Sequence, residues 1–175
     1  MINKIKTPIK DSYVFKTKSI KDDRGSFSRL FCKKEFKIKD NIIKQVNLSF
    51  NKKKFTLRGF HYQEKPFSEG KYIYLLQGSI QFVLIDLRKN SKSYLKKFSK
   101  IIKDKDNYII FIPKGCANAF LTLESNSKIL YFMTQFYKQN LAKGIRYDDP
   151  FFKVKWKHKP LIISKRDKKF PLFRK

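Results

Sequence analysis

Apolar and polar residues alternate in short segments along most of the chain, which is the two-residue period of β-strands and not the longer period of a helix. The pattern is densest between Lys71 and Thr134, in segments rich in Ile, Leu, Phe and Tyr, at 72–76, 80–87, 94–102, 108–112, 120–123 and 128–134. Residues typical of turns separate these segments, at 77–79, 103–107, 113–115 and 124–127. Many short strands with turns between them predict an antiparallel barrel or jelly-roll sandwich.

The first third of the chain carries a weaker strand pattern. Extended segments are predicted at 12–15, 27–31 and 45–50, with turns at 21–27 and 51–54. Residues 33–40 are the best candidate for a short helix, and residues 144–175 read as an irregular tail. No repeat with a period of about 20–50 residues and no Pro/Ser-rich linker divides the chain. We therefore expect one all-β domain over residues 1–175, with a few short helices.

The strand predicted over residues 57–63 contains His61, one of two histidines in the chain. Strict alternation gives this strand two faces, one with Leu57, Gly59, His61 and Gln63, and the other with Arg58, Phe60 and Tyr62. An imidazole ionises at about pH 6.5, which suits proton transfer near neutral pH. The alternative is a histidine that only makes hydrogen bonds inside a packed sheet, and the strand pattern alone leaves both readings open.

Charge is the most unusual feature of the composition, because the formal net charge is +28 at neutral pH. Only seven of the 42 basic residues are arginine, and the lysines are spread from one end of the chain to the other. Lys, Ile, Asn, Phe and Tyr are plentiful together, which is what an A+T-rich genome produces. A nucleic-acid-binding protein, by contrast, usually gathers its basic residues on one face or in one tail. We therefore predict no specific nucleic-acid partner, although the charge favours an anionic ligand such as a nucleoside diphosphate.

No apolar run approaches the roughly 20 residues of a membrane span, and the N-terminus lacks the apolar segment of a signal peptide. We therefore expect a cytoplasmic protein without a membrane partner. Cys32 and Cys116 are too few for a disulfide framework and show no metal-binding spacing, so both are expected to be reduced.

Nine segments, in order along nearly the whole chain, resemble the dTDP-4-dehydrorhamnose 3,5-epimerase family and its sugar-nucleotide relatives. They are Asp23-Arg24-Gly25, Gln45-Val46-Asn47, Leu57-Arg58-Gly59-Phe60-His61-Tyr62-Gln63, Gly70-Lys71, Asp86-Leu87-Arg88, Ile112-Pro113-Lys114-Gly115, Leu130-Tyr131, Gly144-Ile145-Arg146-Tyr147-Asp148-Asp149-Pro150 and Ile163-Ser164-Lys165-Arg166-Asp167. The resemblance implies a cupin-type double-stranded β-helix, which is a jelly-roll barrel. It also implies a reaction that uses neither a metal nor a cofactor.

The family's substrate is a nucleoside-diphosphate 4-keto-6-deoxyhexose, which is epimerised at C3 and C5 through an enolate. By resemblance His61 is the base, and Asp167 is the carboxylate that fixes its tautomer. Tyr131 corresponds to the acid on the opposite face of the sugar, and Lys71 to the cation beside the enolate oxygen. Without the resemblance, Tyr131 would be read as a core aromatic residue, and Asp167 and Lys71 as ordinary surface charges.

A further group of residues matches positions that contact the substrate in the family: Arg24, Phe27, Arg29, Gln45, Asn47, Arg58, Asn118, Tyr137 and Arg146. His158 matches no such position and is expected to be solvent-exposed. Family members are usually homodimers that exchange an N-terminal strand, for which residues 13–15 are the candidate. The implied partners are therefore a nucleotide sugar and a second copy of the chain.

Three positions depart from the pattern of the rhamnose enzymes. Asn118 stands where the family usually has a second histidine, and an amide cannot exchange a proton near pH 7. Phe82 stands where an aspartate is common, and Arg29 replaces a usual acidic residue of the nucleotide pocket. These changes weaken the expectation of two epimerised carbons on a dTDP sugar.

Several alternatives stay open at this point. A single-centre epimerase, acting at C3 or C5, and a 3,4-ketoisomerase of related fold are the alternatives within the enzyme class. A binding protein that kept the barrel without the chemistry would not need the full set of His61, Asp167, Tyr131 and Lys71. A basic nucleic-acid-binding barrel would bind unrelated oligonucleotides tightly and with a steep dependence on salt.

Overall fold

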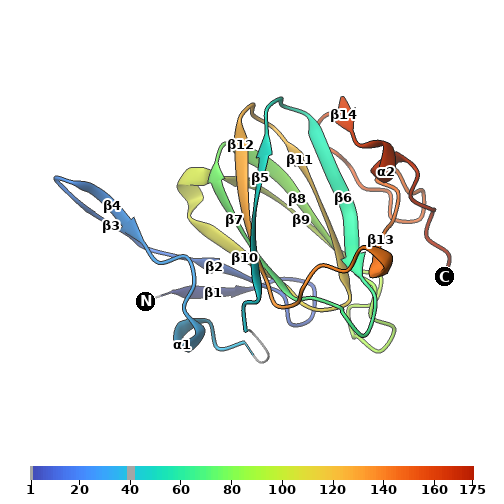
Figure 1. Cartoon of the computed structure of the whole chain (residues 1–175), viewed down its shortest axis with the longest axis horizontal. Helices are drawn as coiled ribbons and strands as arrows, with labels where there is room; N and C mark the ends of the chain where they lie inside the picture. Colours follow the sequence, from blue (N-terminus) through green and yellow to red (C-terminus); the bar gives the residue numbers. More distant parts are fainter. Residues whose placement is uncertain (1, 39–41) are drawn as a thin grey trace.

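The computed structural model describes residues 2–38 and 42–175, which form two β-sheets packed face to face and a hairpin that projects from one end (Figure 1). In chain order the elements are β1 (Asn3–Lys6), β2 (Tyr13–Lys16), β3 (Ser19–Asp22), β4 (Gly25–Ser28), α1 (Lys33–Phe36), β5 (Gln45–Asn51), β6 (Thr56–Gln63), β7 (Lys71–Gln77), β8 (Ser79–Asp86), β9 (Lys97–Lys103), η1 (Asp104–Asp106), β10 (Tyr108–Ile112), β11 (Cys116–Thr122), β12 (Ser127–Met133), η2 (Gln139–Leu141), β13 (Ala142–Gly144), β14 (Ile162–Ile163) and α2 (Lys165–Lys168). The prediction of an all-β fold with a few short helices is confirmed.

The two sheets divide the strands in the manner of a jelly roll. The first sheet has the order β1-β2-β10-β7-β12-β5, and the second has the order β13-β6-β11-β8-β9. Neighbouring strands are antiparallel within both of these paths, and β14 adds to β6 in parallel. The chain crosses from the first sheet to the second at the tight turn between β7 and β8, and both strands contribute buried side chains to the core between the sheets.

The main core lies between the sheets and is formed by branched and aromatic side chains such as Ile73, Leu84, Ile112 and Phe120. Every residue of β8 is buried. One face of this strand contacts the core, and its other face contacts the C-terminal segment through residues such as Val83 and Phe152. Burial on both faces explains why β8 reads as a continuous apolar run rather than an alternating one.

Phe82, one of the three departures from the family pattern, is completely buried in this core and pairs with Phe120 on β11. Phe82 therefore lies beside Phe120, which lines the cavity described below, but does not line that cavity itself. A carboxylate at this position would need a partner, whereas the phenylalanine contributes apolar packing.

A second apolar layer covers the outer face of the first sheet. Phe36 of α1 is fully buried against Phe15 and Tyr72, with ring centroids 4.3 Å and 5.4 Å apart. The helix predicted over 33–40 is shorter than expected, because Lys37 adopts a left-handed conformation with φ of 48° that ends it. Positions 39 and 40 of that prediction lie outside the described residues.

Three other predicted boundaries were wrong for identifiable reasons. The turn predicted over 21–27 is confined to Asp23 and Arg24, because Asp22 accepts a hydrogen bond from the Arg24 N–H and lets β3 and β4 pair closely. The strand predicted from 94 begins at Lys97, since the Leu95 N–H closes a turn onto the Asp86 carbonyl. The tail predicted to be irregular, residues 144–175, contains β14, α2 and the last residue of β13, and all three elements pack along the second sheet.

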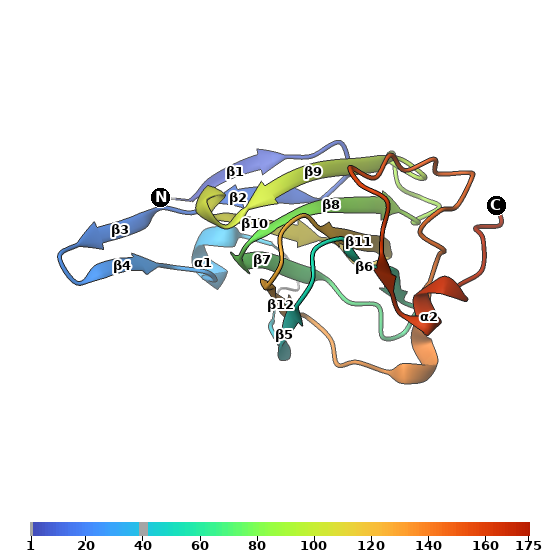
Figure 2. The same ribbon diagram turned by 90° about the horizontal axis from the view of Figure 1, so that it is seen from above.

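Figure 2 shows the projecting hairpin β3–β4 and the C-terminal segment at opposite ends of the molecule. Within the described residues, no helix is long and apolar enough to cross a membrane.

Candidate active site

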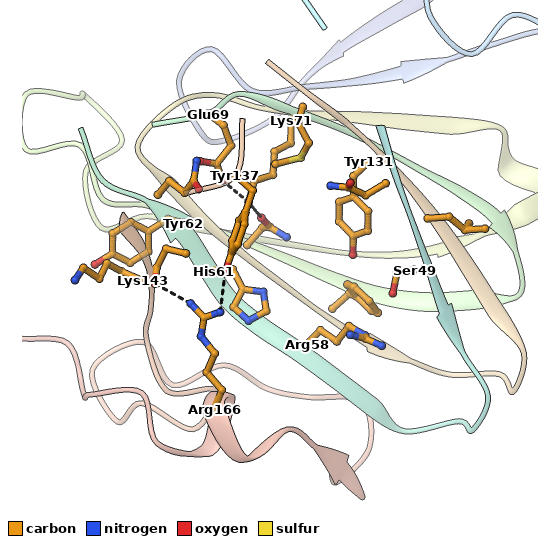
Figure 3. A pocket seen from close by; sticks show the side chains of 17 residues that line it. Ser49, Arg58, His61, Tyr62, Glu69, Lys71, Tyr131, Tyr137, Lys143 and Arg166 are labelled. Carbon is orange, nitrogen blue, oxygen red and sulfur yellow. Dashed lines mark hydrogen bonds and ion pairs between the residues drawn. The ribbon is translucent and has the colours of Figure 1, made fainter. Parts of the chain in front are cut away.

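A cavity of about 310 Å³ opens between the two sheets. Its wall is built by β5, β7 and β12 of the first sheet, by β6 and β11 of the second, and by the segment around Tyr137 and Lys143. Figure 3 shows the side chains that line it, with His61 and Tyr131 coming from different sheets. This placement means that a ligand in the cavity has one of these two side chains on each side.

His61 is held by a carboxylate from the far end of the chain. Its Nε2 lies 2.9 Å from Asp167 Oδ1, and the other oxygen of Asp167 accepts a hydrogen bond from the Gly59 N–H at 2.9 Å. Asp167 is buried, and its own N–H donates to Ser164, the N-cap of α2. The short parallel pairing of β14 with β6 brings this helix turn to the histidine.

The pKa of Asp167 lies below its ordinary value. Burial on its own would raise this pKa, but the hydrogen bond and charge of His61, with the bonds to Gly59 and Ser164, outweigh burial. The carboxylate is therefore ionised at neutral pH, where it can fix one tautomer of the imidazole and stabilise the imidazolium.

The prediction that Arg58 and His61 face opposite ways was wrong, because both line the cavity. The reason is a bulge between β6 and β11, where Asn118 pairs with His61 and Phe120 with Arg58. Three steps along β6 thus match two along β11, and the extra residue reverses the alternation. Gly59 lies at this point with φ of +119°, and a Cβ there would come within 2.6 Å of the Asn118 carbonyl oxygen.

Lys71 lies at the start of β7, and its ammonium is buried in the cavity wall. Its Nζ lies 3.2 Å from Asn118 Oδ1, to which it donates, and 2.8 Å from Glu69 Oε1. Sequence reasoning missed Glu69, which is also buried and lines the cavity. The only signal was an acidic residue two positions before Lys71.

The Tyr131 hydroxyl is poised to stay protonated. Burial raises its pKa well above the usual value of about 10, while the charge of Arg58 and a hydrogen bond with Ser49 lower it in part. Figure 3 shows the phenol on the same side of the cavity as Ser49. A phenol that is still protonated at neutral pH has a proton to donate to a carbanion.

The mouth of the cavity gathers more of the predicted substrate-binding residues. Asn47 and Tyr137 line it, and Gln45 supports both through its amide, which donates to Asn47 and accepts from the Tyr137 N–H. Arg166, which was not singled out from the sequence, donates to the Tyr137 hydroxyl at 3.2 Å and lines the cavity as well. With Arg58, Lys71 and Lys143, this arginine makes the cavity strongly cationic.

Apart from Gln45, which contacts lining residues without lining the cavity itself, four predicted substrate-binding residues do not reach this cavity within the chain. Arg24, Phe27 and Arg29 lie on or beside the projecting hairpin, with Arg29 paired to Glu35. Arg146 pairs with Asp148 at the surface, although its neighbour Ile145 is buried. The hairpin residues therefore lie outside the cavity of their own chain.

The remaining candidates are peripheral to the cavity. His158 is exposed, as predicted, and rests on the ring of Phe55. Cys32 and Cys116 are both free, and burial raises the pKa of the Cys116 thiol. Over residues 2–38 and 42–175, no three His, Cys, Asp or Glu side chains gather where they could hold a metal ion.

Comparison with known proteins identifies the family. Residues 6–175 match the family model described as dTDP-4-dehydrorhamnose 3,5-epimerase. The enzyme of that name from Sinorhizobium fredii is 31% identical over 153 residues, which cover 86% of this chain and 78% of the relative. The one from Methanothermobacter thermautotrophicus is 32% identical over 170 residues, which cover 94% and 90%.

Two solved structures match the fold of this chain over nearly its whole length. The Bacillus anthracis dTDP-4-dehydrorhamnose 3,5-epimerase, crystallised with TDP and PPi bound, superimposes with a TM-score of 0.95 at 27% identity and covers 99% of this chain and 100% of its own. The Legionella pneumophila enzyme, in complex with dTDP-4-keto-L-rhamnose, gives a TM-score of 0.92 at 28% identity, with coverage of 98% and 93%. This chain belongs to the dTDP-4-dehydrorhamnose 3,5-epimerase family of sugar-nucleotide isomerases.

Proposed function

We propose that the chain epimerises C3 and C5 of a nucleoside-diphosphate 4-keto-6-deoxyhexose, with dTDP-4-dehydro-6-deoxyglucose as the expected substrate. The observation that carries this proposal is the pairing of a His61–Asp167 couple with a protonated Tyr131 from the opposite sheet, in one cavity with the Lys71 ammonium. Together these groups can remove a proton from one face of a 4-keto sugar and return a proton to the other face.

The chemistry follows from the ketone. The C4 carbonyl acidifies the C–H bonds at C3 and C5, so the ring nitrogen of His61 that does not face Asp167 can take a proton from either carbon. The electron pair of the broken C–H bond moves into the enolate, whose oxygen is stabilised by Lys71. Tyr131 then donates its proton to the opposite face of the carbon. Proton exchange with solvent restores the phenol and the neutral imidazole for the second centre.

The cationic mouth supports binding of the diphosphate. Arg58, Lys143 and Arg166 line the cavity around the catalytic set. Their charges would be matched by a pyrophosphate group, and the exposed ring of Tyr137 offers a flat face for a base. The relatives bound to TDP and to a dTDP sugar support a dTDP substrate.

Asn118 motivates the alternative of a single-centre epimerase. Its side-chain oxygen accepts a hydrogen bond from Lys71, so it helps to hold the cation but carries no exchangeable charge of its own. Incubating the enzyme with dTDP-4-keto-6-deoxyglucose in D₂O and locating deuterium by NMR separates the two outcomes. Deuterium at both C3 and C5 supports the double epimerase, and deuterium at one carbon supports the alternative.

The same proposal includes a homodimer. The expected exchange strand, residues 13–15, belongs to β2 and pairs with β1 and β10 of its own chain. We therefore propose that the hairpin β3–β4 of each chain, and not that strand, completes the cavity of the other. Arg24 lies at its tip and Phe27 pairs with Ile20 farther along the strands; both are exposed, and neither lines its own cavity (Figures 1 and 2). The outer face of β5 exposes the apolar side chains of Val46, Leu48 and Phe50, each more than half exposed. A row of this kind on an edge strand is typical of a face that another protein covers.

A cytoplasmic location stays a prediction.

A further inference from the structure

Glu69 is an unexpected residue in a site that must bind a dianion. Among the described side chains that line the cavity, it is the only carboxylate, whereas four lining residues are cations, Arg58, Lys71, Lys143 and Arg166. A carboxylate in this place repels a nucleoside diphosphate, so it weakens substrate binding unless it has another task.

The contacts of Glu69 show that its task concerns Lys71. Its Oε1 lies 2.8 Å from Lys71 Nζ, and the side chains of both residues are less than a tenth exposed. Lys71 also donates to Asn118 Oδ1 on β11 of the opposite sheet, so two of its three N–H bonds have fixed acceptors. Figure 3 shows Glu69 and Lys71 next to each other in the wall of the cavity. The third N–H is the one left for a ligand.

Stability does not explain this arrangement. The second oxygen of Glu69, Oε2, is buried without a hydrogen-bond partner in the described part of the chain. An ionised group with an unsatisfied oxygen costs free energy, and a buried ion pair is seldom more stable than apolar packing of the same volume. A residue kept in such a position serves the site rather than the fold.

We propose that Glu69 is a positioning residue, which together with Asn118 holds the Lys71 ammonium so that its free N–H points at the C4 oxygen of the sugar. This assignment rests on the proposed function. It also explains how the chain uses asparagine at position 118, where the family usually has a second histidine. Glu69 and Asn118 each accept a hydrogen bond from Nζ, and together they fix the direction of the ammonium. Lys71 then stabilises the enolate by a directed hydrogen bond, while Glu69 balances part of its charge.

The test combines kinetics with NMR on the full-length protein. In Glu69→Gln an amide oxygen can still accept from Lys71 but the charge is lost, and in Glu69→Ala both are lost. Because misplacing a catalytic group by about 1 Å costs up to about 100-fold, we expect kcat to fall about tenfold in the first variant and about 100-fold in the second. KM for the dTDP sugar should change less than about threefold, since the cations at the mouth are untouched.

Glu64→Gln is the matched control, because Glu64 forms another Glu–Lys pair, 3.9 Å from Lys143, but is about half exposed and does not line the cavity. It should leave kcat at the wild-type value. The ¹H–¹⁵N cross-peak of the Lys71 ammonium, assigned by its loss in Lys71→Arg, gives a readout that does not depend on turnover. A held ammonium exchanges its protons slowly, so the peak should be present in the wild type and in Glu64→Gln and absent in Glu69→Ala.

Two results would overturn the assignment: a kcat that is unchanged in Glu69→Ala, whether or not KM rises, or a Lys71 peak that survives in Glu69→Ala. A loss of activity that only follows the loss of folded protein, measured by thermal unfolding, would also overturn it. If the wild type turns over no sugar nucleotide, the proposed function fails, and the cross-peak by itself still decides whether Glu69 holds Lys71.

Discussion

His61 Nε2 and Asp167 Oδ1 lie 2.9 Å apart although 106 residues separate them in the chain. The contact depends on two local features. The bulge at Gly59 turns His61 into the cavity, and the parallel pairing of β14 with β6 brings the helix turn of Asp167 behind it. The same carboxylate binds the Gly59 N–H, so one side chain fixes both the imidazole and the backbone that carries it.

Replacing Asp167 by Asn should abolish most of the activity while leaving the fold in place. An amide cannot stabilise an imidazolium and can impose the wrong tautomer, so we expect kcat to fall about 10²–10⁴-fold. Steady-state kinetics with the dTDP sugar measure this, with circular dichroism as the check on folding. A kcat within threefold of the wild type would show that the couple is only structural.

Asp167 should also make stability depend on acid pH. Its folded pKa lies below the ordinary value of 3.8, so its contribution to stability is complete above about pH 4 and is lost as the pH falls through the folded pKa. Urea unfolding at pH 7 should show Asp167→Asn less stable than the wild type by about 1–3 kcal/mol, and the gap should close below about pH 4. Asp148→Asn removes an exposed pair with Arg146 and should show a much smaller gap at pH 7. A gap for Asp167→Asn that stays constant down to pH 2 would contradict this assignment.

Tyr131→Phe separates proton removal from proton return. His61 can still take a proton and give one back on the same face, so solvent deuterium should enter the sugar while epimerised product forms at least about 100-fold more slowly. NMR of the recovered sugar reports both quantities. Tyr74→Phe, which removes the hydroxyl of a buried tyrosine outside the cavity, is the control. Normal epimerisation in Tyr131→Phe would remove this residue from the mechanism.

Mixed dimers test whether the hairpin serves the partner's cavity. Arg24→Ala damages the hairpin and His61→Ala damages the cavity, so each should be nearly inactive as a homodimer. A mixed dimer would combine an intact hairpin from one chain with an intact cavity from the other, and we expect about half of the wild-type activity. An inactive mixture, shown by mass spectrometry to contain the mixed species, would mean that the hairpin does not act across the dimer.

The sequence predicts most of the fold because the strand pattern of this chain is strong. Segments such as β7, β10 and β12 are found at their expected places, since each carries a run of Ile, Phe and Tyr between turn residues. The predictions fail where a contact overrides the pattern. Leu95 turns onto Asp86 and delays β9, and Lys37 ends the helix early.

The candidate site was only partly predictable. His61, Lys71 and Tyr131 are found in one cavity as the family resemblance implied. The shared direction of Arg58 and His61 was not foreseen, because a bulge depends on the partner strand and leaves no mark in the period of one strand. Glu69 was missed for a similar reason, since only the packing of β7 against β11 shows that its carboxylate is buried beside Lys71.

The most direct test of the account is the entry of solvent deuterium into dTDP-4-keto-6-deoxyglucose, measured by NMR for the wild type, His61→Ala and His158→Ala. His158 is the other histidine of the chain and is exposed, away from the cavity. We predict deuterium at C3 and C5 in the wild type and in His158→Ala, and a rate reduced by about 10³-fold or more in His61→Ala. Wild-type exchange that persists in His61→Ala would contradict the central claim that His61 is the base.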